Sequence, residues 1–253
     1  MRFPCVPRIE KSPACALAHV DDSPEVAIEA RALARRFGAH WVLRGASLRV
    51  SRGEIVGLLG ANGSGKSTVL RMLATLLRPT AGSASVCGYD VVREADAVRR
   101  RIGFLAHAPG LYDDLSAREN LEFAVTMLGD ARGQPVGIDA VLARVGLSAV
   151  ADTRVRGFSA GMQRRLALAR LLLARPSVLL LDEPYSNLDS AGISLMNEVI
   201  AESAAAGGAA LVVLHELAPA ARLLQRTVEI HEGRIGSADA VPSAAGLVAG
   251  MIA

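Results

Sequence analysis

The chain reads Gly60-Ala61-Asn62-Gly63-Ser64-Gly65-Lys66-Ser67-Thr68 between an apolar run, Ile55–Leu59, and a segment with helical character, Ser67–Leu77, that ends before Pro79. The spacing of the glycines, the lysine and the hydroxyl residues matches the phosphate-binding P-loop pattern. An unbroken apolar run is typical of a strand buried on both faces of a parallel sheet. The loop therefore lies between a predicted strand and a predicted helix. A glycine-rich turn that matched the pattern by chance would not need these neighbours.

Each residue type in this loop has a chemical reason to be there. Glycines let backbone N–H groups turn inward and form a nest for phosphate oxygens, and the next helix presents its N-terminus to the same anion. Lys66 supplies a point charge to the β- and γ-phosphates, where it also acts in catalysis, and Ser67 offers a hydroxyl to Mg²⁺. The predicted phosphate-binding residues are Gly60, Asn62, Gly63, Ser64, Gly65, Lys66, Ser67 and Thr68.

A second apolar run, Val178–Leu181, ends in two acids, Asp182 and Glu183. The carboxyl ends of parallel strands form the edge where doubly wound sheets bind ligands. We expect Asp182 to hold the Mg²⁺ shell and Glu183 to accept a proton from the attacking water. The alternative is that the two acids only begin a turn at Pro184. Taken alone, the acid pair is weak evidence for such a site; together with the P-loop it is strong evidence.

Composition limits the remaining possibilities. The 253 residues carry a net charge of +3 and no block of five like charges, so nucleic-acid binding has no compositional support. Three cysteines, an odd number without metal-ligand spacing, favour a reduced cytosolic setting. The chain contains no apolar run of the length that a membrane helix needs, and residues 1–25 lack the apolar core of a secretory signal.

The order of predicted elements indicates one domain with an insertion. Strand-like runs, of which Val26–Ala30 is the first, dominate up to Leu105. Residues 107–174 become helical, with a capping box at Ser116 and Glu119 and a long helix from Ser159 to Ala174. Strand character returns at Val178–Leu181 and near residues 210–214. We therefore expect a doubly wound α/β sheet that carries an inserted helical lobe.

Phe158-Ser159-Ala160-Gly161-Met162-Gln163-Arg164-Arg165 resembles the signature motif of ABC transporter ATPases, normally Leu-Ser-Gly-Gly-Gln. The stretch departs from that form at Phe158, Ala160 and Met162, and it keeps Ser159 and Gly161. The resemblance covers residues 26–236. It implies a P-loop NTPase (RecA-like) core with an antiparallel β subdomain and an inserted α-helical subdomain at about 107–174. Residues 1–25 are then a flexible N-terminal tail and residues 237–253 a C-terminal tail.

The resemblance also assigns roles outside the P-loop. Phe37 matches the aromatic residue that stacks on adenine, although a buried core Phe is the alternative. Asp189 lies in the loop that reaches across a dimer, and His215 matches the histidine that contacts the γ-phosphate and orients water. His107 stands where the family usually has a Gln, so it is a candidate nucleotide and metal contact whose role the sequence does not define; a surface loop histidine is the alternative.

The same resemblance implies partners and a location. Two copies would sandwich two ATP molecules with Mg²⁺, each nucleotide held by one P-loop and by Ser159 and Gly161 of the other copy. Integral membrane permease subunits would receive the motion through the groove near His107–Leu121. The chain would then act as a peripheral subunit at the cytoplasmic face of the inner (cell) membrane, without nucleic acid.

His107, the Ser-Ala-Gly form of the signature and the stretch Leu111–Leu121 are similar to the ATPase subunits of haem exporters that serve cytochrome c maturation. The alternative is a transporter ATPase for a drug, a polysaccharide or a lipid. A non-transport ABC protein fits less well, because one ATPase core is present and about 90 residues separate Lys66 from Ser159. A GTPase is disfavoured because no Asn-Lys-x-Asp motif occurs.

Overall fold

The computed structural model describes residues 26–128 and 137–237; the expected tail 1–25 and residues 238–253 lie outside that part. Its centre is a mixed sheet in the order β10-β9-β3-β8-β7-β6. All neighbouring pairs are parallel except β9 and β10. The strands are β3 (Ile55–Leu59), β6 (Ile102–Leu105), β7 (Val178–Asp182), β8 (Ala209–Val213), β9 (Arg226–His231) and β10 (Arg234–Ser237). Strands β7 and β8 are buried along their whole length, as their apolar runs predict.

A second, antiparallel sheet has the order β2-β1-β4-β5. It contains β1 (Val26–Phe37), β2 (His40–Ser51), β4 (Ala81–Val86) and β5 (Tyr89–Asp90). Strand β1 is longer than the run Val26–Ala30 expected from the sequence. The register shifts between Ala30 and Leu33, and Ala32 has a φ of 48°, so the strand passes through an irregularity and continues to Phe37.

Helix α1 (Lys66–Leu73) packs between the two sheets, with Val69, Leu70, Met72 and Leu73 fully buried in the core that they share. The helix ends four residues before the expected Leu77. Thr75 has a φ of 64°, and the amide of Leu77 donates back to the carbonyl of Arg71 at 3.1 Å, so the backbone turns out of the helix before Pro79. The short helix α2 (Ala95–Arg99) leads into β6.

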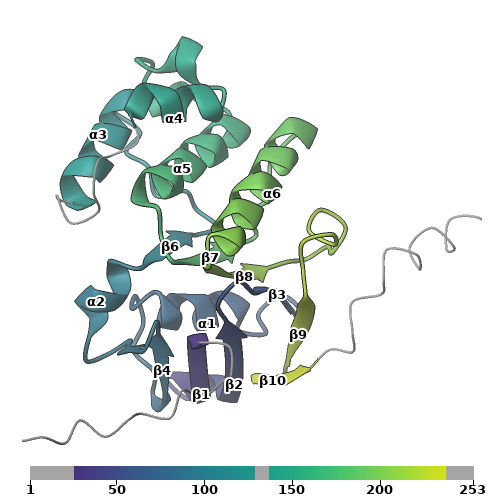
Figure 1. Ribbon diagram of the computed structural model, residues 1–253. Coiled ribbons are helices and arrows are strands. Elements are labelled where there is room, and N and C mark those ends of the chain that lie inside the picture. Colours follow the sequence, from purple (N-terminus) through teal and green to yellow (C-terminus); the bar gives the residue numbers. More distant parts are fainter. Residues whose placement is uncertain (1–25, 129–136, 238–253) are drawn as a thin grey trace, which may run out of the picture.

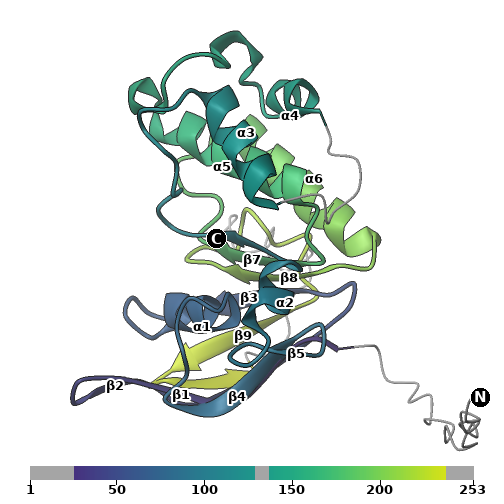
Figure 2. The same cartoon turned by 90° about the vertical axis from the view of Figure 1, so that its left-hand side faces the viewer.

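Helices cover the other face of the mixed sheet (Figure 1). Helices α5 (Ala160–Ala174) and α6 (Ser190–Ala205) pack on it through a second apolar core. Helix α5 also belongs to the helical lobe, which includes α3 (Ala117–Leu128), α4 (Ile138–Arg144), η2 (Ser148–Val150) and η3 (Val155–Gly157). Figure 2 shows the lobe above the sheets as a separate layer. Within the described ranges no helix is long and apolar enough to cross a bilayer.

The capping box predicted at the start of the lobe is confirmed. The Ser116 hydroxyl accepts from the Glu119 amide at 3.1 Å, and the Glu119 carboxylate accepts from the Ser116 amide at 2.7 Å. The hydrogen bond from the Ser116 amide holds the pKa of Glu119 below its ordinary value. Two amides that helix geometry leaves without partners are thereby satisfied.

Ser116→Ala is expected to lower the free energy of unfolding by about 1 kcal/mol, because an N-cap hydroxyl stabilises a helix by that order. Thermal unfolding followed by circular dichroism should show a melting temperature about 2–4 °C lower. Ser194→Ala is the matched control, since its exposed hydroxyl donates to the Glu198 carboxylate within α6 and does not cap a helix. Equal shifts in both variants would contradict the capping role.

Candidate nucleotide site at the carboxyl edge of the sheet

Four parallel strands end at one edge of the mixed sheet, and each is followed by a residue singled out in the sequence. Leu105 of β6 pairs with Leu181 of β7, and Leu181 pairs with Val212 of β8. Leu58 of β3 pairs with Val213 of β8. This register brings the P-loop, the Asp182–Glu183 pair, His215 and the loop with His107 to the same edge.

The P-loop has the backbone that its glycines predict. Gly60 and Gly65 have φ values of 142° and 108°, in the region that favours glycine. A Cβ at Gly65 would lie 2.7 Å from the Leu43 side chain, and one at Gly60 would lie 2.7 Å from the Ile230 carbonyl oxygen. Neither position has room for a side chain, so the loop is packed closely against β2 and β9.

Lys66 is buried, with 6% of its surface exposed. Its Nζ donates to the carbonyl oxygens of Gly60 at 2.6 Å and Ala61 at 3.0 Å. The ammonium group is therefore folded into the loop and surrounded by main-chain groups. A phosphate on the loop would give the group a full negative charge to bind.

Two buried oxygens near this loop have no hydrogen-bond partner among the described residues: Asp182 Oδ1 and Ser64 Oγ. Asp182 is 2% exposed and is the last residue of β7. A buried carboxylate oxygen without a partner is costly, and it is also the kind of ligand that Mg²⁺ prefers. The chemistry of Asp182, together with the half-buried Ser67 at the start of α1, fits a hydrated Mg²⁺ ion.

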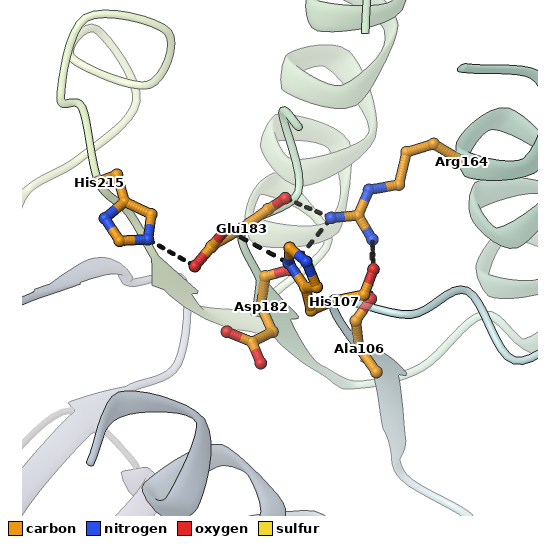
Figure 3. Close-up of polar contacts among 6 residues, drawn as sticks. All are labelled: Ala106, His107, Arg164, Asp182, Glu183 and His215. Carbon is orange, nitrogen blue, oxygen red and sulfur yellow. Dashed lines mark hydrogen bonds and ion pairs between the residues drawn. The ribbon is translucent and has the colours of Figure 1, made fainter. Parts of the chain in front are cut away.

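Glu183 lies between two histidines (Figure 3). Its Oε1 is 2.6 Å from His215 Nε2, and its Oε2 is 3.3 Å from His107 Nδ1. Glu183 has a φ of 50°, an uncommon conformation for a residue with a side chain, which is often found at functional sites. The resemblance to the family marked His215 and His107 as site residues, but it did not predict that both would contact the Glu183 carboxylate.

The signature residues form a separate cluster at the start of α5. Ser159 caps the helix, because its Oγ accepts from the Met162 amide at 3.2 Å. A Cβ on Gly161 would lie 2.9 Å from the carbonyl oxygen of Asn187, so this glycine allows the neighbouring loop to pack closely. In the described part of the chain, the hydrogen bonds do not connect Ser159 with the P-loop.

Asp189 lies in that neighbouring loop and caps α6 by accepting from the Gly192 amide at 2.9 Å. Its Oδ1 also contacts Arg165 Nη2 at 2.6 Å. The hydrogen bond from Arg165, and then the one from Gly192, hold the pKa of Asp189 below its ordinary value. Asp189 and the signature helix are therefore joined within one chain.

Phe158 and Phe37 have different environments. Phe158 is 7% exposed and belongs to the apolar core of the helical lobe, so its departure from the usual Leu keeps a large apolar side chain there. Phe37 is 47% exposed at the end of β1, with the Arg35 guanidinium 4.6 Å from its ring centroid. The alternative of a buried core Phe at position 37 is therefore wrong.

Two arginines of α5 were missed by the sequence analysis. Arg164 donates to main-chain oxygens at the ends of β6 and β7, and Arg170 donates to the Gly110 carbonyl oxygen at 2.5 Å. No sequence pattern could have found them, because their acceptors are carbonyl groups that every residue carries.

Comparisons with known proteins agree with this geometry. The family model described as ABC transporter matches residues 43–186, more than half of the chain. The chain is 40% identical over 227 residues to the daunorubicin resistance ATP-binding protein DrrA3 of Streptomyces coeruleorubidus, covering 88% of this chain and 72% of that protein. It is 38% identical over 199 residues to the cytochrome c biogenesis ATP-binding export protein CcmA 2 of Cupriavidus metallidurans, covering 78% and 92%.

Among solved structures, a dimeric post-hydrolysis state of the ATP-binding cassette MJ0796, bound to ADP and Pi, matches with a TM-score of 0.73 and 25% identity. The match covers 85% of this chain and 99% of that one. These similarities confirm the predicted fold class, a P-loop core with an antiparallel sheet and an inserted helical lobe. The chain belongs to the ABC transporter family, as an ATP-binding and ATP-hydrolysing subunit.

Proposed function

We propose that this edge of the sheet binds Mg-ATP with the residues that the sequence singled out. The observation that carries the proposal is the unpartnered, buried Asp182 Oδ1 beside a glycine loop whose lysine is folded inward. In this assignment the P-loop amides and Lys66 bind phosphate, and Ser67 and Asp182 hold Mg²⁺. When bound, the cation would neutralise charge on the phosphate oxygens. Phe37 stacks on adenine through its exposed ring.

Glu183 is the proposed acceptor of the water proton. Its carboxylate lies at the carboxyl edge, next to Asp182, and His215 holds one of its oxygens at 2.6 Å. A base must lie within hydrogen-bond reach of the proton that it takes. His215 would also contact the γ-phosphate and orient the attacking water. His107 contacts the second carboxylate oxygen in place of the usual Gln, where it is also a candidate metal contact.

A second copy of the chain is the proposed source of the remaining contacts. Ser159 caps a helix whose N-terminus is exposed, and helix N-termini bind anions. In a nucleotide sandwich, Ser159, Gly161 and Asp189 of one copy would face the P-loop of the other. The solved dimer of MJ0796 is consistent with that arrangement. Closure would then depend on charge-assisted contacts to the γ-phosphate, and hydrolysis would remove them.

A permease is the proposed partner at a groove of about 310 Å³ between β6, α3 and α5, whose lining residues are mostly apolar. Its wall includes Tyr112, Phe123 and Met127, which are 52%, 42% and 71% exposed. The ring centroids of Tyr112 and Phe123 lie 4.9 Å apart. Exposed apolar side chains of this size are typical of interaction surfaces. Docking there would place the chain at the cytoplasmic face of the cell membrane.

The proposed cargo is haem or a related component of cytochrome c biogenesis. His107 and the Ser-Ala-Gly signature support it, together with the similarity to CcmA 2. The alternative cargo is a drug, a polysaccharide or a lipid, and the 40% identity to DrrA3 favours a drug among these. The groove residues do not distinguish these cargoes, because they would contact the permease in either case.

Lys66→Ala is expected to weaken ATP binding at least tenfold and to lower turnover at least about a hundredfold, because the buried ammonium is the charge nearest the phosphates. Equilibrium binding of a fluorescent ATP analogue and a phosphate-release assay measure the two effects. Arg71→Ala, at an exposed position on the same helix, is the control and should match the native protein. Unchanged binding and turnover in Lys66→Ala would refute the P-loop assignment.

Glu183→Gln is expected to bind ATP, hydrolyse it at least about a hundredfold more slowly and accumulate as an ATP-bound dimer, because an amide cannot accept the water proton. Phosphate release and size-exclusion chromatography with ATP report the two effects. Glu216→Gln changes an exposed acid beside His215 and should behave as native. A monomeric Glu183→Gln protein with normal turnover would remove Glu183 from the role of base.

Deletion of the gene is expected to abolish covalent haem in c-type cytochromes, which a haem stain of membrane proteins detects. The native gene should restore the stain, and a Lys66→Ala gene should not, because export would need ATP turnover. Unaffected cytochromes would contradict the haem cargo and leave the ATPase assignment intact. Sensitivity of the same strains to a panel of drugs tests the alternative.

A further inference from the structure

Arg164 is a charged side chain inside the protein. It is 3% exposed, and this burial lowers the pKa of its guanidinium, against the opposing effect of the charges on Asp182 and Glu183. Burying a charge is costly unless hydrogen bonds compensate. The hydrogen bonds of the Arg164 guanidinium therefore matter for the stability of the protein and for its function.

All of the hydrogen bonds recorded for the Arg164 guanidinium go to main-chain oxygens (Figure 3). Nη1 donates to the Ala106 carbonyl oxygen at 2.7 Å, just after β6. Nη2 donates to the carbonyl oxygen of Asp182 at 3.2 Å and to that of Glu183. The planar fork of an arginine can bind several acceptors in fixed directions. One side chain thus ties the ends of two neighbouring strands together.

These acceptors flank the proposed catalytic groups. Glu183 has a φ of 50°, an unfavourable conformation for a residue with a side chain, which persists only where surrounding contacts impose it. Its amide donates to the Val213 carbonyl oxygen at 3.2 Å, and its carbonyl accepts from Arg164. Ala106, which the same guanidinium holds, directly precedes His107, and His107 contacts the Glu183 carboxylate at 3.3 Å. Arg164 therefore constrains the backbone on both sides of that contact.

Arg164 also lies on the helix that Ser159 caps, five residues after the cap. We propose that Arg164 is a positioning residue, which links the signature helix α5 to the backbone of Glu183 and of the His107 loop, and so sets the direction of the Glu183 carboxylate. This inference rests on the proposed role of Glu183 as the base. In the described part of the chain, Arg164 donates no hydrogen bond to the Glu183 carboxylate. It therefore acts through the main chain.

Arg170 offers a matched control on the same helix. Burial lowers the pKa of its guanidinium too, and it donates to the carbonyl oxygens of Gly110 at 2.5 Å and Pro109 at 3.4 Å. None of its recorded hydrogen bonds reaches β7 or Glu183. A residue that only holds the loop or stabilises the helical lobe would behave as Arg170 does.

The test compares Arg164→Lys with Arg170→Lys, because lysine keeps the charge and loses the fork. We measure kcat and KM for ATP hydrolysis, the Kd of a fluorescent ATP analogue and the melting temperature. Arg164→Lys is expected to lower kcat about ten- to a hundredfold with KM and Kd within about twofold of native, because a misplaced catalytic group costs rate of that order. Arg170→Lys is expected to keep kcat within about threefold.

A double-mutant cycle separates positioning from general damage. If Arg164 acts through the Glu183 carboxylate, then Arg164→Lys should add less than about threefold to the loss in a Glu183→Gln background, measured by single turnover. Arg164→Gln, which keeps a planar donor group, replaces the lysine variant if that variant melts far below Arg170→Lys.

Three results would overturn the inference. They are a native kcat in Arg164→Lys, an equal loss of kcat in Arg170→Lys, or a loss of rate on adding Arg164→Lys to Glu183→Gln as large as the loss that Arg164→Lys causes alone. The single variant Glu183→Gln tests the base itself. Normal turnover in that variant would refute the proposed function, whereas a defect there with native Arg164→Lys would refute the positioning role alone.

Discussion

The register of the parallel strands is the constraint on which the rest of this structure depends. Strands β3, β8, β7 and β6 are hydrogen-bonded neighbours that run in one direction, so their carboxyl ends lie side by side. The chemical groups come from segments as distant as the P-loop at residue 60 and His215. A slip of one residue in β7 would turn Asp182 and Glu183 to the opposite faces of the sheet, because side chains alternate along a strand.

Helix α5 connects this edge to the helical lobe. Its first turn carries Ser159 and Gly161, its middle packs on the sheet through Ala167 and Leu168, and its other face contributes Leu166 to the core of the lobe. Arg164 and Arg170 add hydrogen bonds from α5 to the β6 end and to the following loop. A displacement of the lobe would therefore act directly on the backbone around His107, which joins the proposed permease groove to the proposed catalytic base.

The departures of this chain from the usual family pattern have different physical consequences. Phe158 fills the apolar core of the lobe, a role in which size and apolarity matter more than identity. His107 contacts the Glu183 carboxylate, where an imidazole and an amide can both form a hydrogen bond. The replacement of the usual Gln by His107 thus keeps a polar contact at the carboxyl edge of the sheet. Neither departure disturbs the strands that position the site.

The amino-acid sequence by itself determined the strand–loop–helix around Lys66, the two acids that end β7, the capping box at Ser116 and the long helix after Ser159. Each of these depends on neighbouring residues, whose periodicity and side-chain chemistry are local. The end of α1 and the length of β1 were predicted wrongly from the sequence. The left-handed backbone at Thr75 determines where α1 ends, and the irregular strand pairing around Ala32 determines how β1 continues. Only the tertiary structure revealed the two histidines on Glu183 and the buried fork of Arg164. Those contacts join distant segments, and for Arg164 the acceptors are main-chain oxygens that leave no pattern in a sequence.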